Sequence, residues 1–445
     1  MKGKFKKFSS AAALRIRRRL FSKCYDLVPL EDLEGFPLTN TEKILTGGQV
    51  QGVKPIFYQE EANEILGYDG VQISPDIYLK TFSNVTIIGR TEFVQHNRTL
   101  YYPKSLDPEI YAFTAEIDQR GRINTDKSRL SIFPRTKVKN IDRAISLIGQ
   151  CSGNYAHWLT EAIARLVLVD ERDDLDAIPI VVDENLHPNL KFILELMNKK
   201  KRKIITVRSY QRIDVGTLHY VTLPGITPAE TRHFFETGEL DKVRPDQYQF
   251  SSAALRLLRE SVHRRVRVSP PRKHSAVNIR RSEVKIEKAN PTNVYLPRTE
   301  ESTGNGRHLI NQNAIEAALS AEGFAHVDVY EKSIEEVIEI FRHVRVVISP
   351  IGATLTNLIF SPPGVEVIIL TPTYPSASFH YFANLMVALG HKVSFVLGTQ
   401  SQFGTHSIYN RDYFVLGSVL EKALESTIWS ASSSDTVGYS VEQHA

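Results

Sequence analysis

The stretch VRVVISPIGATLTN, residues 344–357, predicts a β-strand, a tight turn and the start of a helix. Its first five residues are mostly β-branched and apolar, which favours a buried strand. Gly352 lies in the turn, and the polar residues Thr354, Thr356 and Asn357 follow it. Such a turn directs free backbone N–H groups and the positive end of a helix dipole at one point, which suits a phosphate. A core helix whose glycine permits tight packing fits the same pattern, so both interpretations stay open.

Strand-like and helix-like segments alternate on both sides of this stretch. Helical periodicity at 154–169 and 188–197 is interleaved with apolar strand-like runs at 144–148, 178–182, 203–207 and 218–223. A second alternating block covers 276–400, and a polar, basic connection at 251–275 precedes it. Alternating strands and helices indicate parallel sheets covered by helices. We therefore predict an α/β protein with two parallel-sheet domains, at 136–250 and 276–400.

The remaining segments show weaker patterns. Residues 27–135 contain short β-like runs separated by Pro, Gly and Asp, which predicts a β-rich N-terminal region. Residues 284–306 are polar and contain Pro and Gly, which predicts a long loop. Residues 401–445 are predicted to form a partly disordered C-terminal extension with a helix near 416–424.

Residues 1–26 form a basic amphipathic tail. Nine lysine and arginine residues precede Asp26, the first acidic residue, and Leu14, Ile16 and Phe21 lie among them. This segment lacks the continuous apolar region of a secretory signal. A solvated tail, an organellar transit peptide and a segment that lies on an anionic membrane surface through residues 1–23 are all compatible with it.

Composition limits the compartment and the partners. The 445-residue chain has no run of 18 apolar residues, which argues against a membrane-spanning helix. Its two cysteines, Cys24 and Cys151, give no disulfide framework, which is typical of a reducing compartment. We expect a cytoplasmic protein, with peripheral contact at the inner face of the plasma membrane as the further option. The basic cluster at 256–273 lacks interleaved aromatic residues, so we expect a solvated linker helix and no nucleic-acid partner.

A second motif, NYAHWLTE at residues 154–161, carries candidate acid–base groups. His157 and Glu161 are four residues apart, which places them on one face of a helix. If Asn154 is the N-cap, His157 lies in the first turn, where the helix dipole favours a neutral ring that can accept a proton. We predict that this pair supplies a general base, with His157 preferred and Glu161 as its orienting partner or as the base itself. A histidine and a glutamate at a domain interface would give the same pattern.

With two further motifs, these segments resemble glycosyltransferase family 61, which has a capsular-polysaccharide-type transferase domain. The counterparts are YAHWLTE at 155–161, NIRR at 278–281, Arg307 with Asn311, and the glycine turn at 349–357 followed by Pro-Pro-Gly at 362–364. The resemblance covers roughly residues 140–400. It implies two Rossmann-like domains in a GT-B-like arrangement, with the second domain binding the donor.

The resemblance also implies roles for individual residues. The residues expected to bind the acceptor are Asn154, Tyr155 and Trp158. The residues expected to bind the donor are Arg280, Arg281, Arg307, Ser349, Gly352, Ala353, Thr354, Thr356, Asn357 and Thr371. Guanidinium groups suit phosphate oxygens, although an arginine pair at a strand end is also typical of a surface ion pair. Two positions depart from the family pattern, because Ile351 replaces a histidine and Ile369 replaces an acidic residue.

These observations predict a transferase that moves a sugar from a nucleotide-sugar donor to a glycan, glycoconjugate or lipid-linked acceptor in surface or capsular polysaccharide biosynthesis. The resemblance implies inverting chemistry. Arginines and a helix end can neutralise a diphosphate, and no metal-ligand spacing is visible, so we expect no metal or other cofactor. The alternative, motivated by Ile351 and Ile369, is a non-catalytic protein that binds sugar nucleotides or glycans. No Gly-x-Gly-x-x-Gly follows a predicted strand, which argues against a dinucleotide-dependent oxidoreductase.

Overall fold

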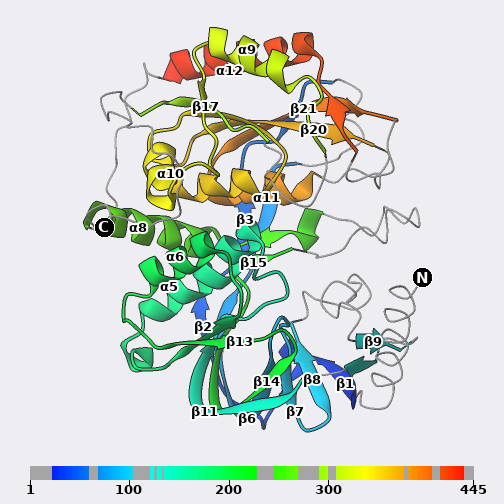
Figure 1. The fold of residues 1–445 in the computed structure, drawn as a ribbon, viewed down its shortest axis with the longest axis vertical. Helices are drawn as coiled ribbons and strands as arrows, with labels where there is room; N and C mark the ends of the chain where they lie inside the picture. The colour runs from blue at the N-terminus through cyan, green and yellow to red at the C-terminus, as the bar shows by residue number, and fades with distance from the viewer. Residues whose placement is uncertain are drawn as a thin grey trace, which may run out of the picture. The chain divides into compact units, whose positions relative to one another are not determined.

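The computed structural model describes residues 23–59, 69–103, 121–124, 128–132, 135–227, 245–268, 290–298, 307–374, 379–402 and 411–434 (Figure 1). The chain divides into two compact units. The first unit contains Met1–Gln49 and Ile73–Val262, and the second contains Val50–Gln72 and His263–Ala445. Each unit is described by itself.

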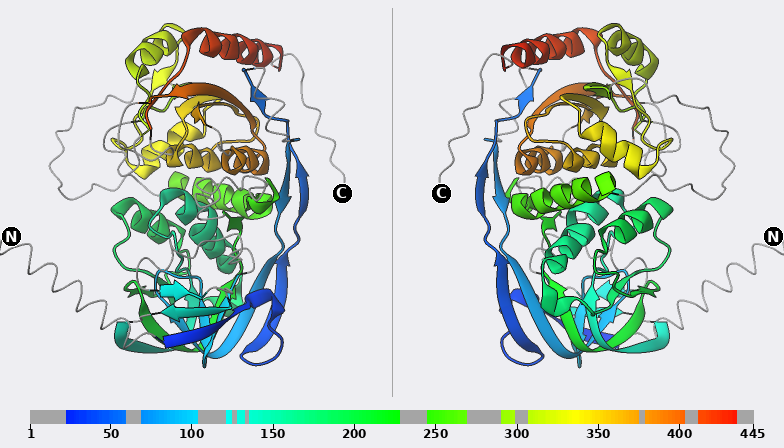
Figure 2. Two further views of the ribbon diagram at one scale, coloured as in Figure 1. Left: turned by 90° about the vertical axis from the view of Figure 1, so that its right-hand side faces the viewer. Right: turned by 90° about the vertical axis from the view of Figure 1, so that its left-hand side faces the viewer.

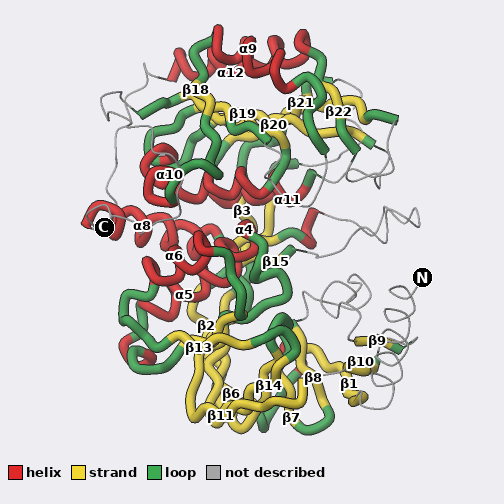
Figure 3. The backbone as a smooth tube through the Cα atoms, viewed as in Figure 1, coloured by secondary structure: helices red, strands yellow, loops and turns green. Residues whose placement is uncertain are grey.

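The first unit is built on one large mixed sheet, visible as the yellow strands in the lower part of Figure 3. Its strand order is β13-β12-β11-β14-β6-β7-β8-β1-β10-β9, and β2 also pairs with β6. The strands are β1 (Lys23–Pro29), β2 (Leu38–Leu45), β6 (Ile77–Ile88), β7 (Val94–His96), β8 (Thr99–Tyr102), β9 (Gly121–Ile123), β10 (Arg129–Ile132), β11 (Arg135–Ser146), β12 (Ile180–Asp183), β13 (Ile204–Val207) and β14 (Gln211–Val221). The strands from β13 to β14 in this order are mutually parallel, whereas β14 and β6 are antiparallel.

The β-rich region predicted at 27–135 is part of this same sheet. β6 pairs with β14 along most of its length, from Leu79 opposite Val221 to Ile88 opposite Arg212. The structure therefore differs from the predicted boundary between 135 and 136. The physical reason is that β14 would otherwise expose a long row of unpaired backbone groups at a sheet edge.

The helices of the first unit follow strands of its parallel part. They are α4 (Tyr155–His157), a π-helical turn (Trp158–Ile163), α5 (Ala164–Asp170), the short 3-10 helix Asp173–Leu175 and α6 (Pro188–Met197). A small ladder joins β15 (Gly225–Ile226) to β16 (Gln249–Phe250), with the 3-10 helix Pro245–Gln247 before it. The boundary between the units falls within α8 (Ser252–Val268), which begins in the segment predicted as a linker.

The second unit contains a sheet in the order β18-β17-β19-β20-β21-β22, with β4 beside β21. Its strands are β4 (Ile56–Phe57), β17 (Asn293–Tyr295), β18 (Ala325–His326), β19 (Val346–Pro350), β20 (Glu366–Thr373), β21 (Lys392–Gln400) and β22 (Tyr413–Phe414). All pairs are parallel except β21 with β22. In Figures 1 and 2, α9 (Gln312–Ala321) and α12 (Gly417–Ser434) cover one face, and α10 (Ile334–Phe341) and α11 (His380–Leu389) cover the other. The 3-10 helix Ala353–Phe360 follows β19.

An α/β fold with parallel-stranded sheets is thus confirmed, while the GT-B arrangement stays a prediction. Two local predictions differ from the structure. β17 lies inside the segment 284–306 predicted as a loop. The segment predicted as a C-terminal extension supplies Tyr413, Val415 and Leu420 to the core of the second unit. β3 (Gly48–Gln51) and β5 (Val71–Ser74) form a separate two-stranded ladder.

In the part of the chain that the structure describes, no helix combines the length and the apolar character needed to cross a membrane.

Candidate active site

The loop between β11 and α4 is fixed by one buried carboxylate. Asp183, at the carboxyl end of β12, accepts hydrogen bonds from the backbone N of Arg90 (2.7 Å) and of Gly149 (3.1 Å), and from Ser152 Oγ (2.6 Å). Asp183 is only 2% exposed. Three charge-assisted bonds in a buried setting leave this loop little freedom, so the start of α4 is held in place.

Asn154 caps the helix that follows. Its Oδ1 accepts a hydrogen bond from the backbone N of Ala156 at 2.9 Å, which confirms the predicted N-cap. After Tyr155–His157 the helix widens into the π-helical turn Trp158–Ile163 before it continues as α5. A π-helical turn inside an α-helix is rare and often accompanies a functional site.

His157 and Glu161 are in direct contact. His157 Nδ1 lies 2.5 Å from Glu161 Oε1, and the two side chains are 16% and 12% exposed. Burial alone would lower the pKa of His157, but the charge and the hydrogen bond of Glu161 together raise the pKa above its ordinary value. The pKa of His157 is therefore shifted upward, whereas the helix dipole predicted a downward shift, because the adjacent carboxylate dominates.

This geometry gives the two groups different roles. Nδ1 donates to the carboxylate, so Nε2 is the ring nitrogen left to exchange a proton with a substrate. A carboxylate on the far side of an imidazole fixes the ring and stabilises the imidazolium that forms when Nε2 takes a proton. The pair therefore suits a general base of raised proton affinity, with Glu161 as the orienting group.

The residues assigned to the acceptor differ in what they can reach. Asn154 is exposed and Tyr155 is half-buried. Trp158 is fully buried, and its Nε1 donates to the carbonyl of Leu190 in α6 at 3.1 Å. The structure gives Trp158 a packing role, because a ring with no exposed surface cannot contact an acceptor in this conformation.

Gly225 in β15 leaves room for the π-helical turn. A Cβ atom at this position would lie 3.0 Å from both Cβ and the carbonyl oxygen of Thr160, which is fully buried. We expect Gly225→Ala to lower the free energy of unfolding by about 1–3 kcal/mol through overpacking against the turn. Urea unfolding monitored by circular dichroism measures this. Gly153→Ala is the control, because its Cβ would meet only the flexible end of Arg90 at 3.3 Å; equal losses in both variants would contradict the expectation.

The glycine turn lies in the second unit, between β19 and the 3-10 helix Ala353–Phe360. Gly352 has a φ of 174°, an extended conformation that any residue adopts, and an added Cβ would make ordinary contacts with Arg298 Nη1 at 3.5 Å and with the carbonyl oxygen of Pro350 at 4.0 Å. The backbone therefore does not require glycine here. The helix that was expected after the turn is a 3-10 helix, with narrower turns than an α-helix.

The donor residues predicted in and beside this turn fall into two groups. Gly352, Ala353 and Thr354 are partly exposed. The buried group is Ser349, Thr356, Asn357 and Thr371. Ser349 Oγ donates to the carbonyl of Pro350 at 2.9 Å, and Asn357 Nδ2 donates to that of Thr354 at 2.8 Å. These hydrogen bonds stabilise the turn within the core, so of the two groups only Gly352, Ala353 and Thr354 expose surface to a ligand.

Sequence reasoning missed Arg298, which reaches this turn from the carboxyl end of β17. Its Nη1 donates to the carbonyl of Ile351 at 3.1 Å. Arg298 and Arg307 both lie close enough to the buried Tyr413 to lower its pKa, although burial, the larger effect, raises it. Arg307 has a φ of 77°, an uncommon conformation for arginine. The run Asn293–Tyr295 followed by Leu296 was the available signal, but a three-residue strand next to a proline is easily taken for a loop.

The remaining residues of the family motifs are Arg280, Arg281 and Asn311. Arg280 and Arg281 lie outside the described residues. Asn311 has a structural role, since its side chain exchanges hydrogen bonds with the backbone N and O of Val415 at 3.2 and 2.8 Å.

Among the described residues, no group of three or more His, Cys, Asp and Glu side chains could hold a metal ion.

Comparison with known proteins gives one family. The family model described as Glycosyltransferase 61 matches residues 155–368, which begin at Tyr155 beside the base pair and end inside β20. The match therefore contains His157, Glu161, Arg298 and the glycine turn. A search of curated proteins finds no match.

Proposed function

Through residues 155–368 the chain belongs to glycosyltransferase family 61, and we propose that it transfers a sugar from a nucleotide-sugar donor to a glycan or lipid-linked acceptor. Family membership supports glycosyltransferase activity over the non-catalytic binding protein considered as the alternative. The contact that carries the proposal is that of His157 Nδ1 with Glu161 Oε1 at 2.5 Å. A transferase that inverts the anomeric centre needs one base for the acceptor hydroxyl, and this pair is the candidate.

For the donor, we favour the turn after β19 together with Arg298. Backbone N–H groups of the partly exposed residues Gly352 to Thr354 and a guanidinium beside them are suitable groups for a diphosphate. Arg307, near the same Tyr413, adds a second positive charge. Cations of this kind neutralise a leaving diphosphate without a divalent ion, which supports the proposal of metal independence.

We expect Arg298→Ala to weaken the binding of nucleoside diphosphates about 10- to 100-fold, since a hydrogen bond to a charged group is worth about 1.5–3 kcal/mol. Thermal unfolding in the presence of a panel of nucleoside diphosphates and sugar nucleotides measures this. A ligand that binds only the folded protein, at 100 times its Kd, raises the free energy of unfolding by about 2.7 kcal/mol. Repeating the panel in chelator tests metal independence.

The matched control is Arg345→Ala, an exposed arginine that immediately precedes β19, at the opposite end of that strand. It should retain the nucleotide-dependent shift. Loss of the shift in both variants would point to a general charge effect, and its retention in Arg298→Ala would remove Arg298 from the donor site.

We also propose that the acceptor belongs to surface or capsular polysaccharide biosynthesis and that the enzyme acts in the cytoplasm, at the inner face of the plasma membrane. The basic segment 1–23 supports this, because clustered cations are attracted to anionic lipids. Co-sedimentation of the full chain with phosphatidylserine vesicles, compared with neutral vesicles, tests the membrane contact.

A further inference from the structure

A buried ion pair lies one helical turn beyond the base pair. Arg165 in α5 is 1% exposed, and Glu92, in the loop between β6 and β7, is 4% exposed. Arg165 Nη1 lies 3.4 Å from Glu92 Oε2. Removing both charges from water is costly, and replacing such a pair by apolar side chains is often neutral or stabilising. Stability alone is therefore a weak explanation for its presence.

Arg165 joins three parts of the first unit. Its Nε donates to the carbonyl of Glu161 at 3.3 Å, on the π-helical turn. Its Nη2 donates to the carbonyl of Ile148 at 3.2 Å, just beyond β11. Its third contact is the carboxylate of Glu92. The guanidinium thus connects the backbone of Glu161, the group that orients His157, to the end of β11.

The surroundings of Glu92 determine how firmly it holds Arg165. Burial, helped by the charges of Glu161 and Asp183, raises the pKa of Glu92 to about 7, against the lowering effects of Arg165 and of the Tyr220 hydroxyl at 3.4 Å. In the described part of the chain, those four are the charged and titratable groups that face it, from α5, β14, the π-helical turn and β12. Among the described residues, Glu92 Oε1 has no hydrogen-bond partner.

Gly149 gives the carboxylate its space. A Cβ atom on Gly149 would lie 2.5 Å from Glu92 Oε1 and 3.7 Å from Arg165 Nη2. Its three nearest neighbours are all atoms of these two flexible side chains. Gly149→Ala would therefore displace Glu92 without removing a charge.

We propose that Glu92 is a positioning residue for the base: it holds Arg165 where the guanidinium fixes the carbonyl of Glu161, and so sets the contact between Glu161 and His157. This inference rests on the proposed function of His157 and Glu161. Glu92 touches no substrate in it. Its effect passes through Arg165 to the backbone of Glu161 and from there to the imidazole.

The test is the titration of His157 in the full chain, followed by NMR of labelled histidine and identified by the signal that is absent in His157→Ala. In the wild type the midpoint should lie above 6.5, the ordinary value. In Glu92→Gln and in Gly149→Ala we expect it to fall by about 0.5 pH unit or more, because Glu161 loses its fixed position and its contact with the ring lengthens. The double variant should show little further change, since both substitutions act on one contact.

The control is Asp170→Asn, which weakens another buried ion pair of α5, that with Arg202. It should destabilise the protein and leave the His157 midpoint unchanged. A wild-type midpoint in both Glu92→Gln and Gly149→Ala, or an equal shift in Asp170→Asn, would overturn the inference.

Kinetics separate this inference from the proposed function. If His157→Ala keeps full transferase activity, the base assignment fails, and the titration still decides whether Glu92 positions the pair. If His157→Ala is inactive, Glu92→Gln should lower kcat with KM unchanged. An unchanged kcat in Glu92→Gln would contradict the positioning role of Glu92 and leave the base assignment of His157 intact.

Discussion

Replacing His157 by alanine lowers kcat for sugar transfer by about 10²- to 10⁴-fold, the range that a positioned general base contributes. The side chain is only 16% exposed, so its loss also removes some packing, and the kinetics are interpreted only for a variant that stays folded. Rates of donor cleavage in the presence of acceptor, with circular dichroism as the check on folding, measure this.

The pH dependence gives a second readout of the same residue. The base must be deprotonated to act, and Glu161 raises the pKa of His157. We therefore expect kcat/KM to rise with pH through a midpoint above 6.5, the ordinary value. The stability of the fold changes with pH in the opposite direction to the rate. The contribution of the ion pair to the free energy of unfolding is complete below pH 6.5 and is lost as the pH rises through the raised pKa of His157. Glu161→Gln should move the kinetic midpoint down, because the amide cannot stabilise an imidazolium.

The matched control is His187→Ala. His187 is an exposed histidine that caps α6, accepting from the backbone N of Asn189 at 3.3 Å, and it takes no part in the base pair. Its replacement should leave transfer unchanged. Wild-type kcat in His157→Ala, or an equal loss in His187→Ala, would remove His157 as the base.

Local chemistry in the sequence predicted the contact between His157 and Glu161. Asn154 as N-cap and a spacing of four residues were enough to bring His157 and Glu161 together, since both depend on one stretch of helix. The direction of the histidine pKa was not predictable in this way. It depends on whether the helix dipole or the carboxylate dominates, and the 2.5 Å contact that decides this is a property of the folded turn.

The same distinction applies to the fold. α6 agrees with its predicted bounds, 188–197, because its signal is local: Pro188 opens the helix. α10 begins at another local signal, the capping box that Ser333 and Glu336 form. The pairing of β6 with β14 joins residues more than a hundred positions apart, and periodicity carries no information about such partners. Arg298 was missed for a related reason, since only the parallel pairing of β17 with β19 brings it to the glycine turn.

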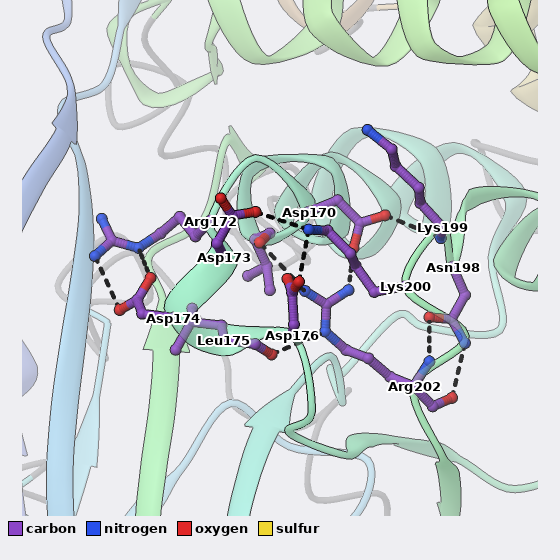
Figure 4. A network of polar contacts seen from close by, with 11 residues as sticks. Asp170, Arg172, Asp173, Asp174, Leu175, Asp176, Asn198, Lys199, Lys200 and Arg202 are labelled. Atoms are coloured by element: carbon purple, nitrogen blue, oxygen red, sulfur yellow. Dashed lines mark hydrogen bonds and ion pairs between the residues drawn. The ribbon is translucent and has the colours of Figure 1, made fainter.

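The largest expected effect on stability comes from Arg202, whose side chain is fully buried in the first unit (Figure 4). Its guanidinium forms an ion pair with Asp170, at the end of α5, and its Nε and Nη2 donate to the carbonyls of Leu175 at 3.1 Å and Val169 at 3.4 Å. Arg202→Ala leaves the 5%-exposed carboxylate of Asp170 without its cation. Breaking one partner of a buried pair costs about 3–5 kcal/mol, so we expect urea unfolding to show a loss of this size.

The control for this loss of stability is Arg172→Ala, which breaks exposed ion pairs instead of a buried one. Arg172 bonds Glu42 and Asp174 in the same region, but these carboxylates are 44% and 62% exposed, and exposed pairs are worth about 0–1 kcal/mol. Replacing both members of the buried pair, as in Arg202→Met with Asp170→Leu, should recover much of the stability, since no uncompensated charge remains. Equal losses in Arg202→Ala and Arg172→Ala would mean that water reaches Asp170 in solution. A double variant as unstable as Arg202→Ala would mean that the backbone hydrogen bonds of Arg202, and not its charge, hold the end of α5.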